Sequence, residues 1–259
     1  MKILDNFFQT QFRKQLHQAY GHVQILKDTD GSLYMPAQVS EAPTWRVDGP
    51  TDFDKFIKRM GMTAVDDSGK EVGKYTMATR GDVKAGKNVT MIIPTFKDKF
   101  GRLWTMIQEE LRPIDAARRG KDARVLAFPA GIIGDEAAFI DESATQSAIR
   151  ELTEETGFAA EKIKSLSPTV IKDGKAVPVP VMTSPGLTDE ATYFFEARIK
   201  SLKPVSKAVT DGGVTRGWYF VPVKKIPKWI ESLSKLGQIP SGQTLSALSL
   251  YNMAKKFRI

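Results

Sequence analysis

The residues between Arg150 and Phe158 carry an acidic cluster that strongly constrains how this part of the chain folds and what it binds. They read Arg-Glu-Leu-Thr-Glu-Glu-Thr-Gly-Phe, so Glu151, Glu154 and Glu155 occur at i, i+3 and i+4. On an α-helix this spacing places the three carboxylates on one side, over a single turn. Such a cluster needs a positive partner, and Mg²⁺ prefers carboxylate oxygens while keeping several waters. The run therefore predicts a metal site rather than an ordinary charged surface.

Local signals predict that this run ends a short helix. Ser143 followed by Gln146 fits a capping box, and Ala148 and Leu152 supply apolar residues at helical spacing. Gly157 falls where a left-handed helix terminator is expected. A helix C-terminus already carries partial negative charge, so three glutamates there are costly without a cation.

The segment that contains this helix resembles the signature of the Nudix hydrolases. From Glu142 to the end of the acidic run the match is complete, including the seven residues between Glu142 and Arg150. Upstream, Phe128–Gly131 reads Phe-Pro-Ala-Gly, as in the ADP-sugar pyrophosphatases of that family. The resemblance extends over about residues 74–259 and points to the ADP-ribose and ADP-sugar pyrophosphatase branch.

The loop before the helix departs from the family pattern. Ten residues separate Gly131 from Glu142, where the family has five. Either the loop carries a five-residue insertion near Gly134–Ala138, or no residue takes the place of the family glycine. We favour the insertion, because loops accept extra residues at modest entropic cost.

The resemblance implies an α/β fold, a Nudix-type α/β/α sandwich with a mixed sheet. It assigns residues 74–259 to the Nudix domain and leaves residues 1–73 as an N-terminal extension that forms a dimer arm, a substrate cover or a partner-binding element. Hydrophobic patterning predicts strands around the acidic helix and then a C-terminal helix, which agrees with such a sandwich. The predicted strands are Asn88–Pro94, Leu103–Ile107, Arg124–Phe128, Lys162–Ile171, Pro178–Thr183, Ala191–Lys200 and Gly217–Val223, and the further helices are Phe53–Met60, Lys228–Gly237 and Thr244–Arg258.

The family's chemistry gives the acidic cluster a role. By resemblance, Glu151, Glu154, Glu155 and the backbone carbonyl of Ala130 hold Mg²⁺ or Mn²⁺. Divalent cations there would neutralise a pyrophosphate group and activate a water for in-line attack. Arg150, by the same resemblance, pairs with Glu142 and holds the loop against the helix.

Candidate substrate contacts lie outside the signature. Arg112, within Glu-Glu-Leu-Arg-Pro, resembles the family arginine that contacts substrate phosphate, although a surface arginine before a turn proline explains it equally well. Ser184 and Gly186 belong to a Ser-Pro-Gly sequence that resembles a loop closing over the site. Tyr75 and Arg80 fall where relatives place an adenine-stacking aromatic and an arginine; for Tyr75 a core position is the competing interpretation.

The general base is left open between two acids. Relatives supply a glutamate from a loop before the last long strand, but the matching stretch here contains Asp211 and no glutamate. Glu190, just after the Ser-Pro-Gly loop, is the other candidate. A water activated by the metal and oriented by Glu154 or Glu155 would reduce the need for a separate base.

Composition limits the setting and the partners. The chain has 259 residues, no cysteine and a formal net charge of +8, which suits a phosphorylated small molecule. The absence of cysteine is compatible with a reducing, cytoplasmic location, and no apolar run is long enough to cross a membrane. RNA is the less favoured partner, and the family implies a homodimer.

Three functions are open at this point. The favoured one is Mg²⁺-dependent hydrolysis of ADP-ribose or an ADP-sugar to AMP and a sugar phosphate. The second is a Nudix hydrolase that acts on dinucleotides, NADH or capped RNA ends. The third is a non-catalytic nucleotide sensor with the same fold, against which the intact carboxylate cluster argues.

Overall fold

The structure is a computed structural model of the chain and describes residues 2–20, 24–27, 31–37, 57–80, 88–120, 123–134, 137–184, 188–208, 215–235 and 238–257. The helices are α1 (Lys2–Tyr20), α2 (Pro113–Arg119), α3 (Ala144–Thr156), α4 (Ile226–Lys235) and α5 (Gly242–Phe257), with the short 3₁₀ turns η1 (Ala137–Phe139) and η3 (Val223–Lys225). The strands are β1 (Leu26–Lys27), β2 (Leu33–Pro36), β3 (Ile57–Val65), β4 (Glu71–Arg80), β5 (Asn88–Lys97), β6 (Leu103–Glu110), β7 (Val125–Ala127), β8 (Ala130–Ile132), β9 (Ala160–Ser165), β10 (Thr169–Lys172), β11 (Lys175–Pro178), β12 (Val181–Met182), β13 (Ala191–Ile199), β14 (Thr215–Pro222) and β15 (Ile239–Pro240).

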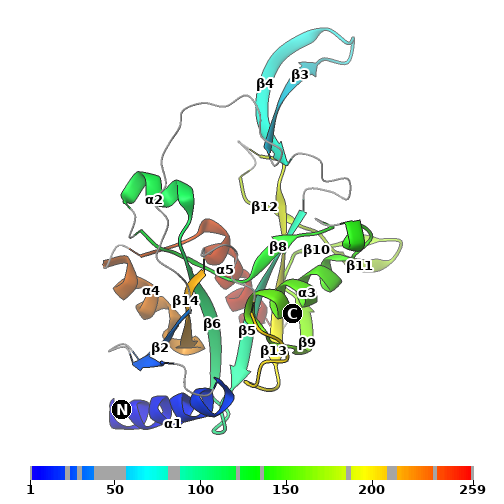
Figure 1. Cartoon of the computed structure of the whole chain (residues 1–259). Coiled ribbons are helices and arrows are strands. Elements are labelled where there is room, and N and C mark those ends of the chain that lie inside the picture. Colours follow the sequence, from blue (N-terminus) through cyan, green and yellow to red (C-terminus); the bar gives the residue numbers. More distant parts are fainter. Residues whose placement is uncertain are drawn as a thin grey trace.

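A mixed sheet forms the middle of the molecule (Figure 1). Its main path runs β1-β2-β14-β6-β5-β13-β12, with β8 paired to β5, β9 to β13, and β7 between β6 and β15. The strands β5 and β13 pair in parallel, whereas β5 and β6 are antiparallel.

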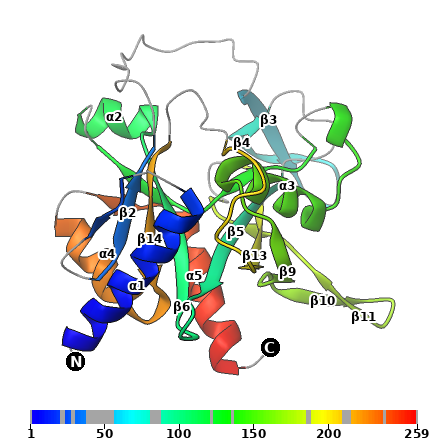
Figure 2. The same cartoon turned by 60° about the horizontal axis from the view of Figure 1, so that its bottom comes forward.

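Helices cover both faces of this sheet (Figure 2). Phe12 of α1 and Leu152 of α3 belong to the core cluster on one face. Trp229 of α4 and Leu248 of α5 belong to the cluster on the other face. The predicted α/β/α sandwich with a mixed sheet and an N-terminal extension is therefore confirmed.

The central strand β5 shows why the sequence folds this way. Ile92 and Phe96 pack in the cluster with α1 and α3, whereas Met91 and Ile93 pack in the cluster with α4 and α5. A strand buried on both faces needs a continuous apolar run, which is the pattern that predicted it. The strand begins at Asn88 as expected and continues to Lys97, three residues beyond the predicted end.

Most predicted elements are present with shifted ends, but two predictions are wrong. The expected helix Phe53–Met60 is wrong where the structure describes it, because Ile57–Val65 forms a strand whose residues pair with Glu71–Arg80. The expected continuous segment Lys162–Ile171 is divided into β9 and β10. In the first case antiparallel pairing with the next strand of a β-hairpin overrides a weak helical pattern.

The N-terminal residues contribute to the core. Phe12 and Leu16 of α1 are fully buried, and β2 pairs with β14 in the main sheet. The division of the chain after residue 73 stays a proposal; that position lies within β4, in the β3–β4 hairpin that projects from the sheet (Figure 1). Within the described ranges, no helix combines the length and apolar character needed to cross a membrane.

Candidate active site

Helix α3 begins and ends as its sequence predicts. The Ser143 and Gln146 side chains form both hydrogen bonds of a capping box, and Gly157 closes the helix in the left-handed conformation with φ of 75°. Ala148 and Leu152 are fully buried beneath it. The helix packs on β5 and β8, so its last turns lie beside the Ala130–Ile132 backbone.

This packing brings two of the three glutamates onto β8. The backbone N–H of Ala130 donates a hydrogen bond to Glu155 Oε2 at 3.2 Å. Glu151 is 6% exposed and lies directly against Gly131, where a Cβ atom would overlap its carboxylate. The Glu154 side chain is the most open of the acids paired with Arg150, with 44% exposed. The structure thus gathers Ala130, Glu151 and Glu155 at one place.

The close approach at Gly131 leads to a testable expectation. Gly131→Ala should destabilise the fold by about 1–3 kcal/mol or displace the Glu151 carboxylate, because the new methyl group has no room. Urea unfolding would measure the stability change, and hydrolysis assays would measure the functional one. Gly61→Ala is the matched control, since a Cβ there meets nothing within 4 Å. Equal behaviour of the two variants would contradict the steric argument.

Arg150 contacts oxygen atoms of four residues around the site. Its Nε and Nη2 donate to Glu142 Oε2 at 3.1 Å and Glu142 Oε1 at 2.8 Å, which is the predicted loop-to-helix pair. Its Nη1 also lies 2.7 Å from Glu151 Oε1 and 3.0 Å from Glu154 Oε2, and its Nη2 donates to the Ile132 carbonyl. The guanidinium therefore neutralises part of the acidic cluster from one side.

The loop carboxylate of Glu142 is held in its charged form. Partial burial raises its pKa, but hydrogen bonds from Arg150, the Gly134 backbone N–H and Ser147, together with the Arg150 charge, outweigh burial and lower the pKa overall. The Gly134 N–H donates to Glu142 Oε1 at 2.9 Å. Glu142 thus fixes the loop end near Gly134, within the segment predicted to hold the insertion.

Strand β6 adds two side chains that the sequence analysis did not include in the site. Burial, and then the negative charges of Glu110 and Glu151, raise the pKa of Glu155 well above its usual value, although hydrogen bonds from Gln108 and the Ala130 N–H act in the opposite direction. Gln108 and Glu110 are both buried and lie two residues apart on the strand, so their side chains point to the same face of the sheet. Their i, i+2 spacing is visible in the sequence, but their place beside Glu155 is set by the fold.

The carboxylate oxygens gathered here are the kind of ligand that a hard divalent cation such as Mg²⁺ prefers. The negative charges of Glu110 and Glu151 disfavour a charge on Glu155, and a cation would relieve that repulsion. Across the described ranges, no group of three or more His, Cys, Asp or Glu side chains is already arranged as a metal site. In this arrangement Arg150 pairs with Glu151 and Glu154 instead.

Arg112 lies at the edge of the same site. Its Nη2 is 2.5 Å from Glu110 Oε2, and its side chain is 53% exposed. The position immediately before α2 thus places a partly exposed guanidinium next to the buried Glu110 carboxylate. This geometry suits phosphate binding, and the role stays a proposal.

Ser184 and Glu190 line a separate polar pocket of about 560 Å³ between β4 and the start of α5. There Gln243 Nε2 lies 3.3 Å from Glu190 Oε1, and Thr79 Oγ1 donates to Asp189 Oδ2 at 2.9 Å. Thr79, Asp189 and Gln243 were not predicted, because only the fold brings these distant segments together.

The other predicted residues fall partly or wholly outside the described residues. The backbones of Tyr75 and Arg80 lie in β4 and pair with Met62 and Ile57 of β3. The side chains of Tyr75 and Arg80 are not among those that the structure describes. Gly186 and Asp211 are outside it entirely. Their proposed roles in stacking, loop closure and base catalysis stay predictions.

Comparisons with known proteins show that this chain resembles a solved structure in fold. No protein-family model matches the chain, and no curated protein matches it. Among solved structures, an ADP compounds hydrolase aligns with a TM-score of 0.54 and 16% identity, covering 86% of this chain and 98% of that one. The NUDIX domain of Shewanella oneidensis NrtR complexed with ADP ribose aligns with a TM-score of only 0.37 and 13% identity, covering 66% of this chain and 88% of that one. The first likeness shows that this chain shares the fold of that ADP compounds hydrolase.

Proposed function

We propose that this chain is a Mg²⁺-dependent hydrolase that cleaves the pyrophosphate bond of a nucleoside diphosphate derivative. The favoured substrates are ADP-ribose and ADP-sugars, with AMP and a sugar phosphate as products. The observation that carries the proposal is the packing of Glu151 and Glu155 against the Ala130–Gly131 backbone, next to Glu110. The proposal is also supported by the fold that this chain shares with an ADP compounds hydrolase, at 16% sequence identity.

In this proposal the residues of α3 and β8 hold the cation. Glu151, Glu154, Glu155 and the Ala130 carbonyl are its ligands, and Mn²⁺ is an alternative to Mg²⁺. When bound, a divalent cation neutralises the pyrophosphate charge and activates water for attack. Gln108 donates a hydrogen bond that orients Glu155.

Two arginines have different roles in the proposal. Arg150, 12% exposed, positions the acidic residues and the loop through its bonds to Glu142. Arg112, more open, binds a substrate phosphate and in doing so exchanges part of its contact with Glu110. The predicted homodimer and cytoplasmic location are kept as parts of the same proposal.

The polar pocket beyond Ser184 is proposed to bind the part of the substrate next to the phosphates. Its hydroxyl and amide groups, including Ser184 and Gln243, suit a sugar with several hydroxyls. Glu190 lies in this pocket and is the described candidate for the base; Asp211 is the other candidate. Glu190→Gln and Asp211→Asn, assayed side by side, would distinguish them.

The test is a substrate panel with and without Mg²⁺. ADP-ribose, ADP-sugars, dinucleotides, NADH and capped RNA are incubated with the protein, and the products are separated by anion-exchange chromatography. We expect AMP and ribose phosphate from ADP-ribose, with turnover lost when EDTA removes the cation. Turnover of another compound in preference to ADP-ribose would move the assignment to that substrate. Nucleotide binding with no turnover of any compound would favour the sensor.

A further inference from the structure

A basic groove opens at the end of the sheet opposite to the acidic site. It has a volume of about 1010 Å³ and lies where β5 ends, β6 begins, β14 leads into η3 and α5 finishes. None of its described lining residues is Asp or Glu. Its cations are Lys97, Arg102, Arg198, Lys224, Lys225 and Lys255.

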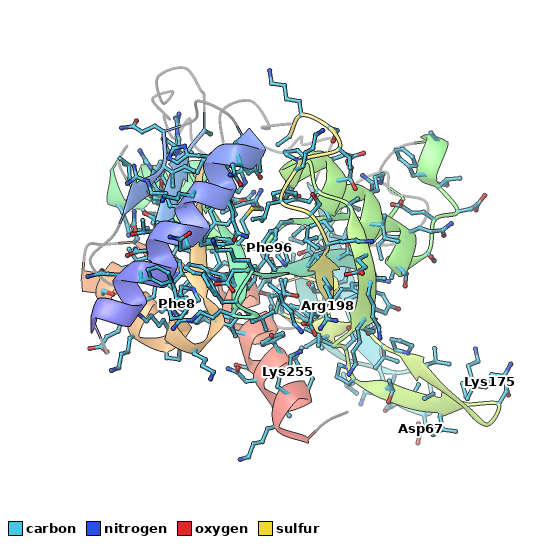
Figure 3. All side chains as sticks on the ribbon, turned by 90° about the horizontal axis from the view of Figure 1, so that it is seen from below. Phe8, Asp67, Phe96, Lys175, Arg198 and Lys255 are labelled. Atoms are coloured by element: carbon cyan, nitrogen blue, oxygen red, sulfur yellow. The ribbon has the colours of Figure 1, made fainter. Side chains whose placement is uncertain are left out.

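A second, smaller hollow extends this groove across the sheet. It has a volume of about 180 Å³ and shares Arg198 and Lys255 with the groove, while adding Lys162 and Lys164 of β9. Its one acidic lining residue is Glu196, whose two carboxylate oxygens each lie 3.1 Å from Lys255 Nζ. Figure 3 shows Arg198 and Lys255 on the face seen from below. The continuous basic strip therefore joins the end of α5 to β9 with a large excess of positive charge.

Exposed aromatic rings stand beside the groove. Phe100, in the turn between β5 and β6, lines it and is 44% exposed; Phe7 of α1 is 48% exposed. The ring centroid of Phe100 lies 5.7 Å from that of Phe7 and 5.0 Å from that of Phe8. The Arg102 guanidinium lies 3.3 Å from the Phe8 centroid, which ties this aromatic cluster of Phe7, Phe8 and Phe100 to the basic residues.

A buried hydroxyl at the groove lacks a protein partner. Tyr251 of α5 lines the groove and is 2% exposed, and within the described part of the chain its hydroxyl has no hydrogen-bond partner. Burial, followed by the charge of Glu196, raises the pKa of this phenol, so the proton stays available for donation. A buried polar group without a partner is unfavourable, and a phosphate oxygen would satisfy it.

We propose that the basic groove and the aromatic cluster form a binding surface for single-stranded nucleic acid. Cations that follow a phosphate backbone, together with exposed rings on which bases stack, are the features that sequence-tolerant binding requires. The aromatic rings favour nucleic acid over an anionic membrane or an acidic protein, neither of which offers bases to stack. RNA and DNA share this chemistry.

The groove and the acidic site are far apart. Ala130 of the acidic site pairs with Met91 of β5, and Lys97, which lines the groove, lies six residues further along the same strand, so roughly 20 Å separates them. Binding at the groove is therefore independent of the proposed hydrolysis, and either proposal can fail without the other.

The test measures binding of labelled oligothymidylate and oligouridylate of about 15 nucleotides by fluorescence anisotropy over a range of salt concentrations. The variant K97E/K224E should bind at least tenfold more weakly than the wild type. Its slope of log affinity against log salt should be shallower by about 1.4, from two lost phosphate contacts. Phe100→Ala should weaken binding about tenfold through lost stacking.

The matched control is K172E/K175E, which makes the same charge change on the exposed β10–β11 hairpin. Figure 3 shows Lys175 at the far end of that hairpin, away from Arg198 and Lys255. The control should keep near wild-type affinity and the wild-type unfolding midpoint. All variants should unfold cooperatively and keep any ADP-ribose hydrolysis of the wild type.

Several results would overturn the proposal. The first is no binding of either oligonucleotide at about 50 mM salt, where phosphate contacts are strong. The second is equal weakening by the control, which would mean that only net charge matters. The third is binding of inorganic polyphosphate as tight as that of the oligonucleotides with no effect of Phe100→Ala, which would make the groove a general polyanion site. Binding to vesicles of phosphatidylserine and phosphatidylcholine without binding to oligonucleotides would assign it to a membrane surface.

Discussion

Glu155→Gln should lower kcat/KM for Mg²⁺-dependent hydrolysis of ADP-ribose by about a thousandfold, or roughly 4 kcal/mol of transition-state stabilisation. The substitution removes one negative ligand from the centre of the proposed site but keeps the shape of the side chain. The amide oxygen can still accept the Ala130 N–H hydrogen bond that holds Glu155 against β8. Steady-state kinetics with purified substrate would measure the change.

The stability of this variant separates a functional role from a structural one. The pKa of Glu155 is raised by burial and by the charges of Glu110 and Glu151, so a charged carboxylate is unfavourable there without a cation. Glu155→Gln should therefore be at least as stable as the wild type in EDTA, although it is inactive. Glu161→Gln, on the exposed part of β9, should change neither property. Full activity in Glu155→Gln would refute the proposed metal site.

Arg150→Met should destabilise the fold by about 3–5 kcal/mol, because it leaves buried carboxylates without their positive partner. The Glu142 and Glu151 side chains that Arg150 contacts are only 7% and 8% exposed. For a chain of this size, such a loss lowers the unfolding midpoint by about 10 °C. Differential scanning calorimetry would measure it. Mg²⁺ should raise the midpoint of the variant more than that of the wild type, since the cation would supply part of the missing charge.

Two further variants test the reason for this loss. The double variant R150M/E142Q should recover part of the stability, because it also removes one of the carboxylates left unpaired. Arg119→Met breaks the Arg119–Asp115 pair on α2, whose arginine is 31% exposed, and should cost no more than about 1 kcal/mol. A loss in Arg150→Met no larger than that in Arg119→Met would show that the network around Arg150 does not stabilise the fold.

The sequence was most informative where the signals are local. The capping box at Ser143, the left-handed Gly157 and the apolar spacing of Ala148 and Leu152 lie within one helix, and all were found as predicted. The apolar run of β5 was equally clear, because burial on both faces leaves no polar alternation. These signals need no knowledge of the rest of the fold.

Prediction failed where contacts beyond a short sequence window compete with local preference. Residues 57–60 were expected to be helical but pair as a strand with residues 77–80, and α1 was not predicted at all. Helix α1 is amphipathic over its length, yet its place is set by contacts such as Phe12 stacked on Trp104 at 4.2 Å. Such contacts join residues about ninety positions apart, and hydrophobic periodicity within a short window does not reveal them.

By itself, the sequence determined the helix that carries Glu151, Glu154 and Glu155, because capping and side-chain spacing are properties of neighbouring residues. Only the tertiary structure decided what surrounds that helix. It placed Glu110 of β6 beside Glu155, Ser184 and Glu190 beside α5, and the scattered lysines in one groove. The reason is that these groupings depend on strand pairing and packing between segments far apart in the chain, which local residue patterns do not encode.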